Sequence, residues 1–287
     1  MRPVWIAKHT TDVLLYKAFP RRERESHKGD YGRVLMICGA KGYTGAPVLA
    51  AKAALRSGSG LIYLVVPEVI YPIVAARLDS AIVLPAPCDS SGRFSEEALP
   101  FILEKMDHMD ACLLGPGLGR SHNIEKIVSE VISHCRVPLV LDADGLNAVS
   151  SHIDVLREAA CPMVLTHHEG EFSRLFRKAE PDRILGAMDF ARQTGCVLLR
   201  KGSRTIITDG SRVYVNTTGN PGMAVGGSGD VLAGILVSIL GRGVPVLEAA
   251  AAAVWLHGQA GNLCAARMGE YAMGPMELTE ALKDNLP

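Results

Sequence analysis

Short apolar runs alternate with helix-like segments along most of this chain, and this alternation constrains the fold more than any other feature. The runs are rich in Val, Ile and Leu and stay apolar over their whole length, as expected for strands buried on both faces of a parallel sheet. They occupy residues 33–38, 61–66, 111–114, 139–141, 163–165 and 196–200. The intervening segments leave room for helical crossovers, such as the amphipathic stretch 47–57. The pattern predicts an α/β fold with a mostly parallel central sheet that is covered by helices on both faces.

Two further runs, 205–208 and 212–215, follow without space for a helix between them. Asp209 and Gly210 separate them, and an Asp-Gly pair is a strong signal for a tight turn between antiparallel strands. We therefore expect an antiparallel hairpin at one edge of the sheet. A long helix with an alanine block is expected at 245–267. No repeat or low-complexity linker interrupts the sequence, so we predict a single domain over 1–287 with its core at about 28–267.

The charge composition argues against several classes of partner. Lys plus Arg and Asp plus Glu both number 30, so the chain lacks the basic footprint of a protein that binds nucleic acid or anionic membranes. The short basic cluster Arg21–Arg24 is interrupted by Glu23 and is expected to be a solvated surface. No apolar run reaches the roughly 18 residues that span a bilayer, and the N-terminus lacks the apolar core of a signal peptide. The seven cysteines are scattered singly, which indicates reduced core residues of a cytoplasmic protein.

The strongest chemical signal is the glycine-rich segment 216–230, which ends in Asp230 and opens an apolar helix expected at 231–240. A glycine-rich turn at the start of a helix exposes backbone N–H groups at the positive end of the helix dipole, where they bind phosphate or another anion. An acid inside such a site should repel phosphate, so Asp230 is interpreted as the general base that takes a proton from an attacking hydroxyl. The alternative is an Asp that merely stabilises the start of a helix. The predicted anion hole consists of Gly226, Gly227, Ser228 and Gly229.

This segment differs from two common phosphate-binding motifs. It lacks the Gly-Lys-Ser or Gly-Lys-Thr ending of a Walker loop. It also lies late in the chain, after a hairpin, whereas the dinucleotide-binding fingerprint joins the first strand to the first helix. Both of the corresponding folds are therefore excluded.

Glycine and polar residues gather directly after five of the predicted strands. Because ligands bind beyond the carboxyl ends of the strands in open parallel sheets, these loops are expected to meet at one edge. Together they predict a site for a large, polar ligand that carries phosphate. The loops comprise residues 39–46, 115–119, 142–147, 166–171 and 200–205.

Five motifs taken together resemble the ADP/ATP-dependent NAD(P)H-hydrate dehydratases. They are Gly-Pro-Gly-Leu-Gly at 115–119, Leu-Asp-Ala-Asp-Gly-Leu-Asn at 141–147, Leu-Thr-His-His-Glu-Gly-Glu-Phe at 165–172, Lys-Gly-Ser-Arg-Thr at 201–205 and Gly-Gly-Ser-Gly-Asp-Val-Leu-Ala-Gly at 226–234. The resemblance covers about 28–267 in family order, although the last motif alone is shared by ribokinase-like kinases. It implies the ribokinase-like fold, in agreement with the predicted sheet. One departure is visible: the family usually has Thr-Pro-His where this chain has Thr166, His167 and His168, and the following Gly-Glu places the family's histidine at His168.

Members of this family repair hydrated NADH and NADPH, so the resemblance implies a hydro-lyase that restores the reduced cofactor. ADP or ATP, with Mg²⁺, would phosphorylate the hydroxyl of the S-epimer, and loss of phosphate would restore the double bond, because phosphate leaves more readily than hydroxide. A stand-alone domain resembles ADP-dependent bacterial members, which favours ADP. The resemblance also implies a homotetramer, with NAD(P)H-hydrate epimerase as the functional partner. Carried over residue by residue, Asp230 is the catalytic base, the hydrated cofactor contacts Ala46, Gly117, His168 and Asp230, and the nucleotide contacts Lys201, Gly202, Ser203, Arg204, Thr205 and Gly229.

Several of these residues also have simpler interpretations. Lys201 could be a solvated lysine at the end of a strand, and His168 could cap the next helix or lie on the surface. Three further residues could hold Mg²⁺ through water or cap the following helix, so no residue is assigned as a metal ligand. They are Asp142, Asp144 and Asn147. His257, amid alanines, is predicted to be a packed core histidine, and Cys38 a buried strand residue.

Two other functions stay open on the sequence. A small-molecule kinase of the same fold, acting on a hydroxymethyl-pyrimidine, a thiazole or a sugar, would keep Asp230 and the anion hole but release a stable phosphorylated product. The combination of Gly-Pro-Gly-Leu-Gly with Leu-Asp-Ala-Asp favours the dehydratase over that kinase. A non-catalytic nucleotide sensor would be expected to lose the base or the glycine-rich turn, and neither is lost.

Overall fold

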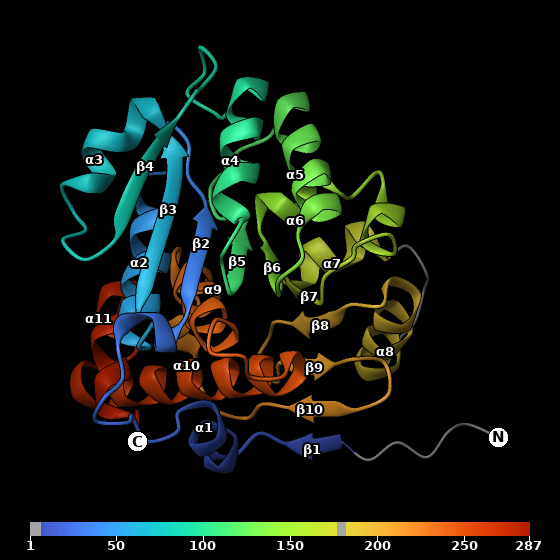
Figure 1. Cartoon of the computed structure of the whole chain (residues 1–287). Helices are drawn as coiled ribbons and strands as arrows, with labels where there is room; N and C mark the ends of the chain where they lie inside the picture. The colour runs from blue at the N-terminus through green and yellow to red at the C-terminus, as the bar shows by residue number, and fades with distance from the viewer. Residues whose placement is uncertain (1–6, 177–181) are drawn as a thin grey trace.

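The computed structural model describes residues 7–176 and 182–287, and a single ten-stranded sheet forms the centre of that part of the chain (Figure 1). Within it, only β9 runs antiparallel to its neighbours. The predicted mostly parallel sheet is therefore confirmed. In spatial order the strands are β1 (Ala7–His9), β10 (Val213–Val215), β9 (Ile206–Thr208), β8 (Val197–Arg200), β7 (Met163–His167), β6 (Leu139–Asp142), β5 (Ala111–Leu114), β2 (Arg33–Ile37), β3 (Leu61–Pro67) and β4 (Ile82–Ala86).

Both ends of the sheet carry a strand that the sequence pattern did not predict. The predicted antiparallel pair β9–β10 is present near one end, but β1 pairs with β10 and takes the outermost position. β1 is only three residues long and largely polar, so no apolar run in the sequence indicates a strand there. β4 closes the other end and contains Pro85, which an edge strand tolerates because one side of its backbone needs no partner.

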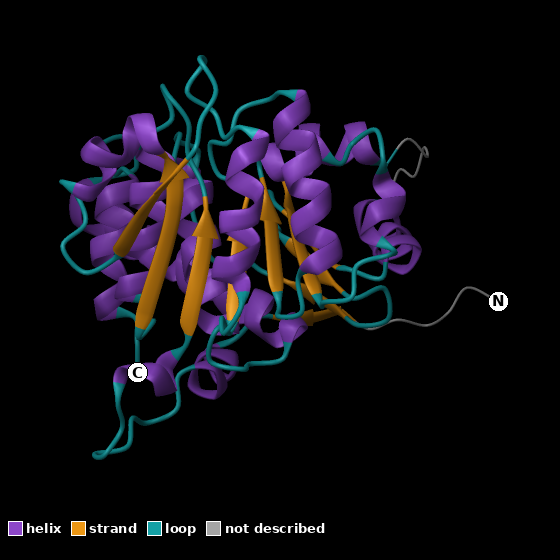
Figure 2. Cartoon of the chain, turned by 45° about the horizontal axis from the view of Figure 1, so that its top comes forward, coloured by secondary structure: helices purple, strands orange, loops and turns teal. Residues whose placement is uncertain are grey.

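Helices cover both faces of the sheet, as Figure 2 shows. The side chains of β2 divide between the two faces, since Val34 and Met36 belong to one core and Leu35 and Ile37 to the other. The first core is covered by α1 (Asp12–Ala18), α2 (Gly45–Arg56), α3 (Tyr71–Ala75), α9 (Ser228–Leu240), α10 (Val246–Met268) and α11 (Pro275–Ala281). The second is covered by α4 (Leu99–Met106), α5 (His122–His134), α6 (Asp144–Ala148), α7 (Glu169–Leu175) and α8 (Arg183–Thr194).

Short 3₁₀ helices complete the described chain. They are η1 (Lys28–Tyr31), η2 (Glu68–Ile70), η3 (Glu96–Ala98), η4 (Ile153–Leu156), η5 (Pro221–Met223) and η6 (Leu282–Asp284). Within the described residues, no helix is both long enough and apolar enough to cross a membrane.

Close packing of α9 against α2 fixes where the glycine-rich turn lies. A Cβ atom on Gly234 would come within 2.2 Å of the backbone oxygen of Ala50, so the two helices can approach this closely only because residue 234 is glycine. β10 runs in the same direction as β8, and segment 216–227 leads from its carboxyl end to the first residue of α9. The start of α9 therefore lies at the same edge of the sheet as the loops that follow β2, β5, β6, β7 and β8, as the sequence predicted.

Candidate active site

The amino-terminal end of α9 presents free backbone donors. Gly227 precedes the helix with φ of 96°, and a Cβ atom there would lie 2.6 Å from Leu49 Cδ1, so glycine is required for both conformation and space. The backbone N–H groups of Gly226, Gly227 and Gly229 donate to no acceptor within the described part of the chain. The N–H of Ser228 already donates to the carbonyl of Val225 at 3.3 Å. Three of the four predicted anion-hole residues thus offer an unused donor.

Asp230 is the third residue of α9 and lies partly buried beside these donors. Burial raises the pKa of its carboxyl to about 7, with further increases from the nearby charges of Asp142 and Asp144 and an opposing effect of Lys201. A carboxyl group with a pKa near 7 can accept a proton at neutral pH, as a general base must. An ordinary aspartate at the start of a helix would not have this environment, which favours the catalytic interpretation.

Lys201 extends from the end of β8 toward Asp230 and the turn. Its Nζ lies 3.1 Å from Oδ1 of Asp142, which is 2% exposed and also accepts a hydrogen bond from the hydroxyl of Thr166. A Cβ atom built on Gly229 would lie 3.7 Å from the same Nζ. Burial opposes the ammonium charge, but Asp142 and other acids outweigh it and raise the pKa of Lys201. The lysine is therefore a charged group inside the site, rather than a solvated residue at a strand end.

Most of the rest of the predicted nucleotide loop lies on the surface. Gly202, Ser203 and Arg204 form an exposed turn after β8. Thr205 is buried, and its hydroxyl donates to the carbonyl of Gly202 at 3.0 Å, which closes the turn. Within the described residues, no hydrogen bond or ion pair joins these four residues to Asp230. Lys201 thus lies near Asp230, the predicted catalytic base, whereas the turn that follows it is exposed.

Two residues predicted to contact the hydrated cofactor lie against each other. Gly117 has φ of +67°, and a Cβ atom there would come within 3.1 Å of Ala46 Cβ and 2.9 Å of Tyr43 Cβ. The loops after β2 and β5 are therefore in contact through residues that carry little or no side chain. Tyr43 is 56% exposed at this contact, and sequence reasoning did not single it out. Its only signal was its position in the glycine-rich loop 39–46.

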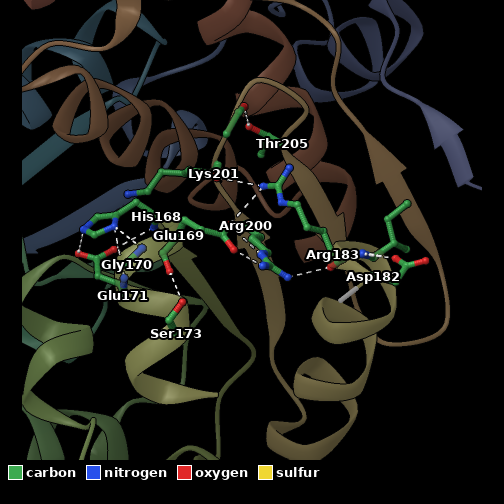
Figure 3. Close-up of polar contacts among 12 residues, drawn as sticks. His168, Glu169, Gly170, Glu171, Ser173, Asp182, Arg183, Arg200, Lys201 and Thr205 are labelled. Carbon is green, nitrogen blue, oxygen red and sulfur yellow. Dashed lines mark hydrogen bonds and ion pairs between the residues drawn. The ribbon is translucent and has the colours of Figure 1, made fainter. Parts of the chain in front are cut away.

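His168 caps α7, as one of the two simpler interpretations proposed. Its Nδ1 accepts hydrogen bonds from the N–H groups of Gly170, at 3.0 Å, and Glu171, at 3.3 Å. Its Nε2 lies 3.2 Å from the carboxylate of Glu171, and the side chain is 57% exposed. Figure 3 shows the side chains of Lys201 and His168 extending in the same direction. A helix cap that stays this exposed retains a face that can contact a ligand.

An ion pair between the buried Arg200 and the exposed Glu169 joins the nucleotide loop to the His168 loop, and the sequence analysis missed it. The Arg200 guanidinium binds both carboxylate oxygens of Glu169 and donates to the carbonyl of Arg183 at 3.0 Å (Figure 3). It also stacks on Phe172, with its Cζ 4.0 Å from the ring centroid. Arg183 in turn reaches the carbonyl of Lys201 at 3.4 Å. The available signal was positional: Arg200 and the acidic loop stand at the ends of the neighbouring strands β8 and β7. These contacts fix the two loops relative to each other.

The aspartates of loop 142–147 are already engaged by protein groups. Asp144 accepts the N–H of Gly119 at 2.9 Å and the side-chain amide of Asn147 at 3.3 Å. Neither aspartate caps α6, because Ala143, with φ of 51°, precedes the helix and makes no side-chain cap. Over 7–176 and 182–287, no group of three His, Cys, Asp or Glu side chains could hold a metal ion. The residues present therefore do not form a complete magnesium cage.

The two residues predicted to be core residues are buried. His257 is 8% exposed, and its Nε2 lies 3.3 Å from the hydroxyl of Ser228, while burial lowers its pKa to about 4. Cys38 is fully buried at the end of β2, and burial raises the pKa of its thiol. Both predictions are confirmed.

Comparisons with known proteins agree with these motifs. A family model for NAD(P)H-hydrate dehydratases matches residues 34–284. The chain is 43% identical over 269 residues to a bifunctional NAD(P)H-hydrate repair enzyme of Moorella thermoacetica. This match covers 92% of this chain and 51% of that relative. It is 35% identical over 271 residues to an ADP-dependent (S)-NAD(P)H-hydrate dehydratase of Cenarchaeum symbiosum, covering 93% of this chain and 92% of that protein. The chain spans about half the length of the bifunctional relatives that it matches.

Solved structures share the fold. A ribokinase-like superfamily protein from Enterococcus faecalis superposes with a TM-score of 0.86 at 26% identity, covering 100% of this chain and 98% of that one. The ADP/ATP-dependent NAD(P)H-hydrate dehydratase from Bacillus subtilis, co-crystallised with ATP and Mg²⁺, gives a TM-score of 0.82 at 26% identity, with 97% of each chain covered. The predicted ribokinase-like fold is confirmed.

Proposed function

The chain belongs to the NAD(P)H-hydrate dehydratase family, and we propose that it catalyses the ADP- or ATP-dependent dehydration of the S-epimer of hydrated NADH and NADPH. The observation that carries this proposal is the carboxyl of Asp230, with its pKa of about 7, beside the unused N–H donors of the glycine-rich turn. A base and an anion hole at the same helix start are what phosphoryl transfer to a hydroxyl requires. We take residues 1–287 to act as one catalytic domain.

The reaction proceeds in two balanced steps. The hydroxyl oxygen of the hydrated ring attacks the terminal phosphoryl group of ADP, Asp230 takes the hydroxyl proton, and AMP leaves with the bridging oxygen. The N–H groups of Gly226, Gly227 and Gly229 donate to the phosphoryl oxygens as negative charge redistributes. The C–O bond of the phosphate ester then breaks, phosphate departs with the electron pair, and a ring proton passes to water as the double bond is restored. With ATP as donor the nucleotide product is ADP.

Lys201 lies between the carboxylate of Asp142 and the glycine-rich turn at Gly229. Its ammonium pairs with Asp142 and lies close to Gly229. A phosphate that enters the turn therefore meets a positive charge that is already positioned, which offsets the negative charge of Asp230. We assign Lys201 to the phosphates and the exposed turn Gly202–Thr205, with Gly229, to the remainder of the nucleotide. Ala46, Gly117 and His168 are assigned to the hydrated cofactor.

Mg²⁺, when bound, would supply positive charge to the nucleotide phosphates. The carboxylate of Asp142 is taken up by Lys201 and Thr166, and that of Asp144 by Gly119 and Asn147. We therefore propose that nucleotide oxygens and water hold the ion, since Mg²⁺ retains several waters in such sites. No side chain of this protein is assigned as its ligand.

Three further proposals concern the setting of the enzyme. We propose a cytoplasmic location, which the seven free cysteines support, because reducing compartments keep thiols unpaired. We propose that NAD(P)H-hydrate epimerase supplies the S-epimer, since a dehydratase with one acceptor geometry needs the other epimer converted. A homotetramer is proposed from the family resemblance.

One assay separates the candidate functions. Purified protein is incubated with hydrated NADH, Mg²⁺ and either ADP or ATP, and the dihydronicotinamide absorbance band is followed while nucleotides and phosphate are quantified. The proposal expects NADH, AMP and phosphate in equal amounts from ADP. Phosphate that stays on a small alcohol substrate would identify a kinase. Nucleotide binding without turnover by any donor would favour a sensor.

A further inference from the structure

A second polar site lies where the amino-terminal ends of the strands meet, whereas Asp230 lies beyond their carboxyl ends. A groove of about 1000 Å³ runs between α1, the following segment 19–31, the turn between α2 and β3, and Arg242 after α9. In Figure 1 these elements gather at the lower end of the molecule, near the C-terminus and the amino-terminal ends of β2 and β3. The five residues of β2, at roughly 3.3 Å each, place the groove about 16 Å from the loops that form the candidate active site. The proposed reaction uses no residue of this groove.

Two arginines flank one glycine inside the groove. Arg22 Nη2 donates to the carbonyl of Gly58 at 3.0 Å, and Arg242 Nη1 donates to the carbonyl of Ser57 at 2.6 Å. A Cβ atom placed on Gly58 would lie 2.9 Å from Arg22 Nη2 and 3.4 Å from Arg242 Nη1. The two guanidinium groups, from opposite ends of the sequence, therefore meet at the same point.

Aromatic rings hold both guanidinium groups in place. Arg22 Cζ lies 3.9 Å from the centroid of Tyr31, and Arg242 Cζ lies 4.3 Å from the centroid of Phe19. Stacking of this kind orders a guanidinium group before any ligand arrives. The segment Arg21–Arg24 is exposed, as its composition predicted, and it also contributes one arginine to this groove.

The positive charge of this pair has no partner in the described part of the chain. Neither arginine forms an ion pair there, although Glu23, Glu25 and Asp30 also line the groove. Arg242 Nε and Nη2 are buried without any hydrogen-bond acceptor in the described chain. Burial and the charge of Arg22 lower the pKa of Arg242 to about 10, so Arg242 stays charged at neutral pH. Two adjacent like charges with unused donors are unfavourable until an anion joins them.

We propose that this groove binds a small organic oxyanion, with its phosphate or carboxylate group held between Arg22 and Arg242. The forked donors of guanidinium groups match both kinds of oxyanion. Tyr16, Phe19 and Leu55 give the adjoining wall an apolar character suited to an aromatic or aliphatic body. The groove volume lies at the upper end of the range for small-molecule sites.

The test compares probes on the full-length protein by calorimetric titration. Phenyl phosphate and benzoate present the two oxyanions on the same ring, and inorganic phosphate presents the anion without a body. We expect phenyl phosphate or benzoate to bind the wild type, and Arg22→Met to weaken that binding at least tenfold. Arg56→Met is the matched control, because Arg56 lines the same groove but is already paired with Glu280 at 2.8 Å. The control should bind the probe as the wild type does.

Thermal unfolding and turnover distinguish a binding site from a structural one. The probe should raise the Tm of the wild type and of Arg56→Met but not that of Arg22→Met. Without ligand, Arg22→Met should leave Tm level or raise it, because one of two repelling charges is gone, and turnover of hydrated NADH should be unchanged. The proposal is overturned if none of the probes binds the wild type, if Arg22→Met binds as the wild type does, or if both variants lose affinity equally. Inorganic phosphate binding as tightly as phenyl phosphate would overturn the assignment of an organic body.

Discussion

Asp230→Asn is the substitution that separates the proposed base from an ordinary helix-end residue, because the structure predicts opposite effects on catalysis and stability. The replacement keeps the size and polarity of the side chain but cannot take a proton. Turnover should fall by about 10²–10⁴. Affinity for ADP should stay level or increase, since a carboxylate beside the anion hole repels the phosphate that it helps to react.

The effect on stability follows from the raised pKa. The pKa of Asp230 is about 7 in the folded protein, against an ordinary value of 3.8. The folded state therefore binds this proton more tightly than the unfolded state does, and wild-type stability falls as pH rises from about 4 to about 7. At 1.36 kcal/mol for each pKa unit, the full penalty above pH 7 is about 4 kcal/mol.

Asparagine removes this penalty but leaves a partly desolvated amide. We therefore expect Asp230→Asn to unfold with a free energy about 1–3 kcal/mol higher than the wild type near pH 8, and with no gain near pH 4. In the wild type, kcat/KM should rise with pH through about 7 as Asp230 loses its proton. Urea titrations at several pH values measure the first effect, and initial rates of NADH formation measure the second.

The control is Asp12→Asn, which changes an aspartate in the first turn of α1, away from the site. A helix-dipole interaction alone is worth roughly 0.3–1 kcal/mol, and its loss would lower stability. The reasoning fails if Asp230→Asn behaves like this control, with lower stability near pH 8 and turnover near that of the wild type.

Three other substitutions test the assigned subsites. Lys201→Met should weaken ADP binding more than binding of the hydrated cofactor by calorimetry, and should move the pH–rate midpoint upward, because Lys201 lowers the pKa of Asp230. Gly117→Ala should raise KM for hydrated NADH, since its Cβ would crowd Ala46; Gly42→Ala, also at positive φ but in open space, controls for backbone strain and should leave KM unchanged. His168→Asn retains an acceptor that caps α7, so Tm should hold while KM for the hydrated cofactor rises; an unchanged KM would leave His168 as a cap only.

The sequence by itself determined the strands and their common edge. The apolar runs that became β2, β3, β5, β6, β7 and β8 are local signals, because a strand buried on both faces must be apolar along its length. Because these strands run parallel, the five loops that follow β2, β5, β6, β7 and β8 lie at one edge of the sheet. The glycine-rich turn then indicated the start of a helix with free backbone N–H donors. Even so, β1 carries too little apolar pattern to be recognised, and Pro85 interrupts the otherwise apolar β4, where proline argues against a central strand.

Only the tertiary structure decided how the charged groups of the site interact. Lys201 directly follows β8, Asp142 ends β6, and β7 lies between these strands, so the contact depends on side-chain length across two strand spacings. The pKa of Asp230 reflects burial by many atoms and the fields of Asp142 and Asp144, and no local pattern records such a sum.

Tertiary packing likewise forms the groove at the amino-terminal ends of the strands. Arg22 sits in a cluster whose composition indicates a solvated surface, and Arg242 is a single arginine after an apolar helix. They meet because η1 and the end of α9 pack beside the turn at Gly58, where the two guanidinium groups converge. Tertiary packing decides which charged side chains far apart in the sequence come into contact. Local sequence patterns do not determine that packing.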